Sequence, residues 1–197
     1  MPPLSIVAIS YRSTNYYVIG AGKTRLLLDL GYPGTLGMMR AALERKGVGL
    51  AEITHGFATH YHPDHAGLAQ EMKASGMVLL IAPEQLEAAP VMKRWTKPDE
   101  HYVDIVLTDA RTQVVPLAES RAYLSSIGLA GELIHTPGHS DDSVSLLLDD
   151  GSVFTGDLTH PMLIDTSIDA VTPQSWRTLY DRGARTVYAG HGPVRAL

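Results

Sequence analysis

Residues 59–65 (THYHPDH) concentrate side chains of the kinds that bind metal ions. Within six residues the segment holds four nitrogen and oxygen donors, a density typical of metal ligands: His60, His62, Asp64 and His65. In extended backbone, residues two apart point to the same side, so His60 and His62 can aim at one point. Pro63 then bends the chain, which lets Asp64 and His65 turn towards a second point nearby. A polar loop with chance histidines is the weaker interpretation, because three of the nine histidines lie here.

Three later segments share one form, an apolar strand that ends in glycine followed by a residue of ligand type. The residues that follow these glycines are His139, Asp157 and His191. Glycine lets the backbone turn sharply and come close to a metal, and strand-end ligands lie on loops that a rigid scaffold holds. A lone histidine after a strand is more often structural, but three such segments in this order indicate one shared site.

The order HxHxDH, PGH, TGD and GHG resembles the metallo-β-lactamase superfamily, and residues 26–31 (LLLDLG) resemble the family's early strand that ends in aspartate. The resemblance implies a first metal held by His60, His62 and His139. It implies a second metal held by Asp64, His65 and His191, with Asp157 bridging the two. Two zinc ions suit such histidine-rich ligands, with iron or manganese as alternatives.

The resemblance also implies that Asp29 is a carboxylate beside the metal histidines, where outer carboxylates are common. A turn residue at the end of a strand is the alternative. His160 lies three residues after Asp157, where related lactonases typically have tyrosine. We expect it to donate a hydrogen bond to the substrate oxyanion or to move a proton to the leaving group; a packing or surface histidine is the alternative.

Two metals roughly 3.5–4 Å apart lower the pKa of a shared water and make hydroxide available at neutral pH. We expect this bridging hydroxide to attack a carbonyl or phosphoryl centre. Asp64 is expected to orient the nucleophile or move its proton, besides acting as a ligand.

Departures from the family pattern narrow the substrate class. One β-lactamase group uses a cysteine as a metal ligand, and this chain has no cysteine. Another group lacks the bridging aspartate, which the resemblance places at Asp157 here. Only six residues follow His191, so we expect no counterpart of the region with which glyoxalase II binds glutathione. Nothing in the sequence resembles the basic arm of the tRNA-processing relatives. We therefore expect hydrolysis of a small ester, thioester or lactone. The alternatives are a persulfide-dioxygenase-like oxidoreductase with one iron, a phosphodiester hydrolase, and a binding protein without catalysis, against which the intact ligand set argues.

The elements that must position these residues follow from hydrophobic patterning and from turn residues. Helices are predicted over residues 36–46, 65–75 and 173–182. Residues 117–126 are predicted as irregular structure or a short helix. The clustered strands predict an α/β sandwich of two mixed sheets with helices on the outer faces, and the resemblance implies a four-layer αββα fold in one domain, residues 1–197. Strands are predicted over residues 4–9, 15–19, 25–30, 54–59, 77–82, 113–115, 132–135, 143–148, 152–155 and 186–189.

The long interval between His65 and His139 contains residues 89–102, which we predict to form a loop over the metals. Its candidate substrate contacts are Met92, Trp95, His101 and Tyr102. Long irregular loops in compact domains are often functional; the alternative is a surface excursion whose aromatic residues fold into the core. Elsewhere, Asp141 and Asp142 are interpreted as turn or capping residues, and His55 and His135 as structural.

Composition excludes several partners. The net charge is −5 without a run of basic residues, so no nucleic-acid partner is expected. No run of 18 apolar residues occurs, and residues 1–5 lack a basic leader, so neither a membrane partner nor a signal peptide is expected. We expect a cytoplasmic enzyme with a small-molecule substrate.

Overall fold

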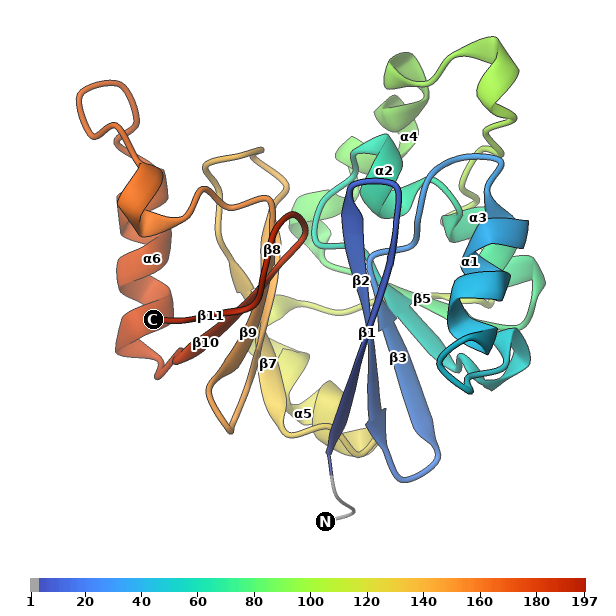
Figure 1. Ribbon diagram of the computed structural model, residues 1–197, viewed down its shortest axis with the longest axis horizontal. Helices are drawn as coiled ribbons and strands as arrows, with labels where there is room; N and C mark the ends of the chain where they lie inside the picture. Colours follow the sequence, from blue (N-terminus) through green and yellow to red (C-terminus); the bar gives the residue numbers. More distant parts are fainter. Residues whose placement is uncertain (1–3) are drawn as a thin grey trace.

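In the computed structural model, which describes residues 4–197, two β-sheets pack face to face and helices cover their outer faces (Figure 1). The signal-peptide expectation rests on residues 1–5, and residues 1–3 lie outside the described residues. None of the helices within residues 4–197 is both long enough and apolar enough to cross a membrane.

The first sheet has six strands in the spatial order β1-β2-β3-β4-β5-β6. β1, β2 and β3 pair in antiparallel fashion, whereas β3, β4, β5 and β6 run parallel. This change of direction brings the β1–β2 turn to the same end of the sheet as the carboxyl ends of β3 and β4. The strands are β1 (Ser5–Tyr11), β2 (Thr14–Ala21), β3 (Thr24–Leu28), β4 (His55–Phe57), β5 (Val78–Ile81) and β6 (Thr112–Val114).

The second sheet has five strands in the order β11-β10-β9-β8-β7. β8 is antiparallel to both neighbours and β9 is parallel to β10, so β7, β9 and β10 all run in one direction. Their carboxyl ends therefore share one end of the sheet. The strands are β7 (Gly131–His135), β8 (Val144–Leu148), β9 (Ser152–Gly156), β10 (Thr186–Ala189) and β11 (Arg195–Ala196).

Alternation along the strands divides the core into three layers, because successive side chains of a strand point to opposite faces. In β3, Leu26 and Leu28 face the second sheet, whereas Leu27 faces the outer helices. In β9, Phe154 faces inward and Val153 packs outward with α6. Helices α1 and α3 cover the first sheet and α6 covers the second, which confirms the predicted sandwich (Figure 1). The helices are α1 (Leu36–Glu44), α2 (Pro63–Ala66), α3 (Ala69–Ala74), α4 (Ala88–Val91), α5 (Ser120–Ser126) and α6 (Thr172–Asp181).

The prediction of one continuous helix over residues 65–75 is wrong, because the chain forms two separate helices there, α2 and α3. Two backbone carbonyls that would accept hydrogen bonds in a continued first helix accept from other donors instead. The Asp64 carbonyl accepts from the Tyr16 hydroxyl at 3.3 Å, and the His65 carbonyl accepts from the Leu30 backbone N–H at 2.6 Å. The Leu68 N–H donates to the Leu30 carbonyl instead of continuing the first helix. The break thus ties the metal-binding motif to the end of β3.

Other elements differ from prediction mainly at their ends. β4 has three residues rather than six, because the chain leaves the sheet where the motif begins. β11 was not predicted, since two residues carry no periodic signal. The segment after β5 contains α4 and short helical turns rather than an irregular loop (Pro83–Gln85, Met92–Trp95 and Pro98–Glu100). Residues 117–126 contain a helical turn followed by α5.

Candidate metal centre

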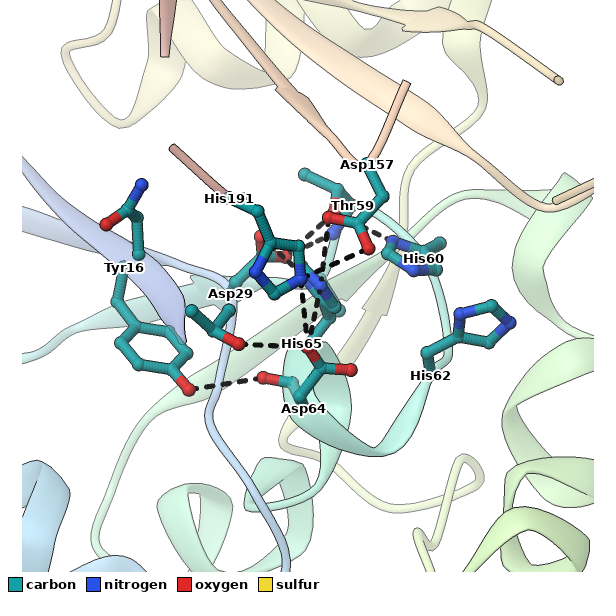
Figure 2. Close-up of polar contacts among 12 residues, drawn as sticks. Tyr16, Asp29, Thr59, His60, His62, Asp64, His65, Asp157 and His191 are labelled. Carbon is teal, nitrogen blue, oxygen red and sulfur yellow. Dashed lines mark hydrogen bonds and ion pairs between the residues drawn. The ribbon is translucent and has the colours of Figure 1, made fainter. Parts of the chain in front are cut away.

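All seven predicted ligands lie together at the end of the sandwich where β4, β7, β9 and β10 end. They form three overlapping groups, and within each group the donor atoms lie within 4.8 Å of one another. Two of these groups are the two trios that the family resemblance implied. The groups are His60, His62 and His139; His60, His65 and Asp157; and Asp64, His65 and His191. Figure 2 shows His60, His65, Asp64, Asp157 and His191 turned towards a common centre.

The short helix α2 orients the first-sheet ligands. His62 precedes it in extended conformation, Pro63 occupies its first turn, and His65 lies in its last turn. Proline is well suited to this position because the first turn needs no N–H donor. The ring centroids of His60 and His62 lie 4.5 Å apart, and His62 Nδ1 lies 3.0 Å from His139 Nε2 of the second sheet. The predicted convergence of His60 and His62 is therefore present.

Two glycines allow the second-sheet ligands to approach closely. A Cβ on Gly156, which has a φ of 54°, would lie 2.3 Å from the Thr59 hydroxyl. A Cβ on Gly190 would lie 2.6 Å from both Asp157 Oδ1 and the His65 ring. The β9–β10 register also shifts between Tyr188 and Ala189, just before the ligand loop. The glycine-before-ligand pattern therefore reflects close packing between the ligand loops.

Asp29 links the metal-binding motif to β3. Its Oδ1 accepts hydrogen bonds from the Thr59 backbone N–H at 2.8 Å and from the Thr59 hydroxyl at 2.9 Å. Its Oδ2 lies 2.9 Å from His65 Nδ1, and both side chains are buried. Asp29 adopts a positive φ of 61°, a conformation that is uncommon for a residue with a side chain and is held only by strong surroundings. The residue lies where an outer carboxylate that orients a metal histidine would lie.

Three further polar contacts orient ligands and were not predicted. The Thr59 hydroxyl lies 3.2 Å from His60 Nδ1, and the Ser13 carbonyl accepts from His191 Nδ1 at 2.7 Å. The Thr14 hydroxyl donates to Asp64 Oδ2 at 2.9 Å. In His60, His65 and His191, the contacts at Nδ1 leave Nε2 to face the centre, the arrangement usual for metal-bound imidazoles. The position of Thr59 directly before the motif was a usable signal, whereas nothing local marks Ser13 or Thr14.

A family model described as "Metallo-beta-lactamase superfamily" matches residues 10–191. The chain belongs to this superfamily. An atrochrysone carboxyl ACP thioesterase from Aspergillus fumigatus is 30% identical over 191 residues, covering 93% of this chain and 52% of the relative. A "probable metallo-hydrolase" from Methanocaldococcus jannaschii is 31% identical over 157 residues, covering 78% of this chain and 70% of the relative. The chain spans about half the length of several curated relatives that it matches.

Solved structures of the superfamily share the fold. A metallo-β-lactamase family protein from Thermus thermophilus aligns with a TM-score of 0.70 at 20% identity, over 100% of this chain and 75% of that one. TTHA1623, solved in a di-iron-bound form, aligns with a TM-score of 0.69 at 21% identity, over 98% of this chain and 94% of that one. These alignments confirm the predicted sandwich of the superfamily.

Three buried donor atoms at the centre lack hydrogen-bond partners within the described residues, which fits a metal-binding superfamily. Buried Nε2 atoms of His60 and His65 and Oδ1 of Asp157 make no hydrogen bond within the described residues. His65 Nε2 lies 3.2 Å from carboxylate oxygens of Asp64 and Asp157, but without hydrogen-bond geometry. Buried polar atoms are almost always satisfied, so these atoms fit the ligand shell of a cation.

The pKa values of two buried histidines of the motif shift in opposite directions, because their neighbours carry different charges. Burial lowers the pKa of His60 well below its usual value, and the neighbouring histidines lower it further. Burial also acts to lower the pKa of His65, but the carboxylates of Asp29, Asp157 and Asp64 outweigh it and raise that pKa well above its usual value. Without metal, His65 is therefore expected to carry a proton at neutral pH.

The remaining predicted residues divide into those beside the centre and those away from it. His160 lines a cavity together with His139, Asp157 and His191. His55 lies in β4 with its Nδ1 on Thr54, and His135 contacts the Asp141 carbonyl, so both serve as structural residues. Asp142 accepts from the Tyr61 backbone N–H at 2.7 Å and thereby holds the motif loop rather than capping a strand.

The predicted substrate segment, residues 89–102, requires correction. Met92 is 0% exposed and packs in the core, and Tyr102 packs against the same core, so neither lies open above the ligands. His101 is exposed with a positive φ beside Gly34. Trp95 is 69% exposed and shares a surface depression with the ligand His62. The aromatic residues are divided between core and surface because the segment folds as helical turns.

Replacing Asp29 with asparagine is expected to lower metal affinity by about 10- to 100-fold, because the amide orients His65 less firmly than the carboxylate does. Asparagine tolerates a positive φ, so the backbone should be retained. Titration with a chelating dye measures the affinity. Asp104→Asn is the matched control, since Asp104 is exposed and its one ion pair in the described part of the chain is with Lys93. Equal affinities of Asp29→Asn and the wild type would contradict the role given to Asp29.

Metal uptake is expected to release protons, and metal affinity is expected to rise with pH. The pKa of His65 is raised in the metal-free protein, so its proton must leave before Nε2 can bind metal. Calorimetry in buffers of different ionisation enthalpy counts the protons at neutral pH. Asp29→Asn should release fewer, because it removes one carboxylate that raises the His65 pKa. A binding heat that does not depend on the buffer would contradict this prediction.

Proposed function

We propose that the chain is a binuclear zinc-dependent hydrolase that cleaves a small ester, thioester or lactone, with residues 1–197 acting as one domain. The observation that carries the proposal is the position of Asp157 between the two trios. Its Oδ1 lies 3.2 Å from His65 Nε2, and its Oδ2 lies 3.3 Å from His191 Nε2 and 3.6 Å from His139 Nε2. A carboxylate that reaches donors of both trios fits a bridge between two metal ions.

Two metals in this site would be held by His60, His62 and His139 and by Asp64, His65 and His191, with Asp157 shared. When bound, such metals supply a nucleophilic hydroxide at neutral pH and polarise the carbonyl oxygen of the substrate. His60 and His65 are buried, whereas His139 and His191 are exposed, so the substrate would approach from the second sheet. Asp64 is held by Thr14 and faces His65 and His191, which fits a role in orienting the nucleophile or accepting its proton.

His160 is suited to act on the substrate oxygen. Its Nδ1 accepts a hydrogen bond from the Met162 N–H at 3.3 Å, so a neutral ring carries its proton on Nε2. Its ring centroid lies 6.4 Å from that of Trp176. A fixed N–H donor in a cavity shared with metal ligands can stabilise developing negative charge or protonate a leaving group.

Relatives support the hydrolase class. The Aspergillus fumigatus relative is named a thioesterase and the Methanocaldococcus jannaschii relative a metallo-hydrolase. Thioesters, esters and lactones all present an acyl carbonyl with a leaving group, so one site geometry suits the three. TTHA1623 was solved with two irons, which makes iron the main alternative to zinc.

Elemental analysis of the protein purified without added metal is expected to find about two zinc ions per chain. His62→Ala and Asp157→Ala should lose metal and ester or thioester hydrolysis together, whereas Asp104→Asn should keep both. About one iron per chain would redirect the search to sulfur or oxygen redox chemistry. A protein that takes up no metal even when metal is added would contradict the proposal.

His160→Gln is expected to lower kcat by roughly 100-fold without changing metal content, because it removes an acid–base group and no ligand. Steady-state kinetics on an ester substrate, with metal analysis on the same sample, measures both. His135→Gln is the matched control, since the His135 side chain is exposed and its one hydrogen bond within the described residues is with the Asp141 carbonyl. An unchanged kcat in His160→Gln would leave His160 as a packing residue.

A further inference from the structure

A cavity of about 300 Å³ extends from the proposed metal centre over the outer face of the second sheet. The metal ligands His139, Asp157 and His191 form one part of its wall. Its volume lies at the lower end of the roughly 300–1,000 Å³ typical of small-molecule sites. The cavity therefore suits a small substrate whose reacting carbonyl lies beside the ligands.

Apolar side chains line the part of the cavity beyond the ligands. Val187 and Ala189 of β10 contribute from the sheet, and Leu158 and Leu163 contribute from the segment that follows Asp157. Val187 and Leu158 belong to the cluster under α6, so these walls are firmly packed. Leu163 is 74% exposed and forms part of the rim. An aliphatic acyl chain would cover these surfaces and remove them from water.

Arg195 supplies a positive charge to this cavity. It lies on β11 opposite Val187, in antiparallel register with β10. Val187 precedes Ala189 by two residues, about 7 Å of strand, and the chain then continues from Ala189 to the ligand His191. The backbone position of Arg195 is thus displaced along β10 away from the metal ligands.

No carboxylate within residues 4–197 neutralises Arg195, in contrast to several other arginines. Arg121 pairs with Asp149 and Glu132, and Arg182 pairs with Glu132. Guanidinium groups bind carboxylates through paired hydrogen bonds. An unpaired guanidinium that lines an apolar cavity is therefore a candidate contact for an anionic ligand.

We propose that this cavity binds the acyl part of the substrate and that Arg195 pairs with a second carboxylate at the distal end of that acyl chain. The inference rests on the proposed function, which places the scissile carbonyl at the metal centre. In the reaction, water adds to the thioester carbonyl, the carbon–sulfur bond breaks, and the leaving thiolate takes up a proton. The products are a free thiol and a dicarboxylic acid.

The test compares adipoyl and hexanoyl thioesters of one thiol, which differ only in the terminal carboxylate. The zinc-loaded wild type is expected to favour the adipoyl substrate. Arg195→Gln should lower kcat/KM for the adipoyl thioester by about fivefold, the effect of losing a partly exposed ion pair, and leave the hexanoyl thioester unchanged. Arg195→Glu should reduce adipoyl turnover further. Arg185→Gln is the matched control, since Arg185 is exposed and lies outside the cavity.

Two further measurements separate binding from catalysis. Calorimetry with adipate and hexanoate should show tighter adipate binding to the wild type, and Arg195→Gln should lose that difference. Leu163→Ser should weaken turnover of both thioesters equally, because it removes apolar wall and no charge. Ile168→Ser is its control, since Ile168 is 85% exposed and does not line the cavity.

The possible outcomes distinguish the two proposals. A metal-loaded wild type that hydrolyses neither thioester nor any related ester would overturn the proposed function. Hydrolysis of both thioesters at equal kcat/KM, with a ratio that Arg195→Gln does not change, would overturn the role of Arg195 and leave the hydrolase intact. An adipoyl preference that is lost equally in Arg195→Gln and Arg185→Gln would also overturn it, since the effect would then come from net charge alone.

Discussion

The buried carboxylate of Asp29 is the contact on which the rest of the centre depends. One oxygen holds Thr59, and through it the start of the motif loop, while the other holds His65. The Thr59 hydroxyl in turn lies 3.2 Å from His60 Nδ1 and leaves no room for a side chain at Gly156. A single buried group therefore links β3, the motif loop and the Asp157 loop of the second sheet. Its left-handed backbone conformation fits a position where the surroundings determine the geometry.

The two sheets contribute differently to the centre. The first sheet supplies the buried histidines and the Asp29 contact, whereas the second supplies the exposed histidines, His160 and the apolar cavity. The buried candidate ligands of the first sheet and the exposed ones of the second sheet thus meet at Asp157. Changes in the segment after Asp157 could alter substrate preference without disturbing the buried ligands. This division fits a superfamily in which one fold carries different activities.

Sequence patterns predicted the clustering of the seven candidate ligands because the signals of these residues are local. Residues 60–65 hold four donors in one short segment, and each later ligand follows a strand and a glycine. Thr14 and Ser13 carry no such signal, since they reach Asp64 and His191 only through the packing of distant strands. The break between α2 and α3 was unpredictable for a similar reason, because Tyr16 and Leu30 take up the carbonyls that a continuous helix would use. The burial of Met92 likewise depends on which neighbours the fold brings to it.

The contact between Ser13 and His191 spans 178 positions of sequence, and Asn15 donates to the Ala189 and Gly192 carbonyls across a similar interval. The β1–β2 turn lies near the N-terminal end of the sequence. It therefore holds in place the loop that carries the last candidate ligand, His191. Contacts of such long sequence separation are slow to form, because much chain entropy is lost before they contribute stability. The second metal position would accordingly be completed late in folding, after the two sheets have docked. A newly made chain would acquire its full ligand set only when this long-range closure has taken place.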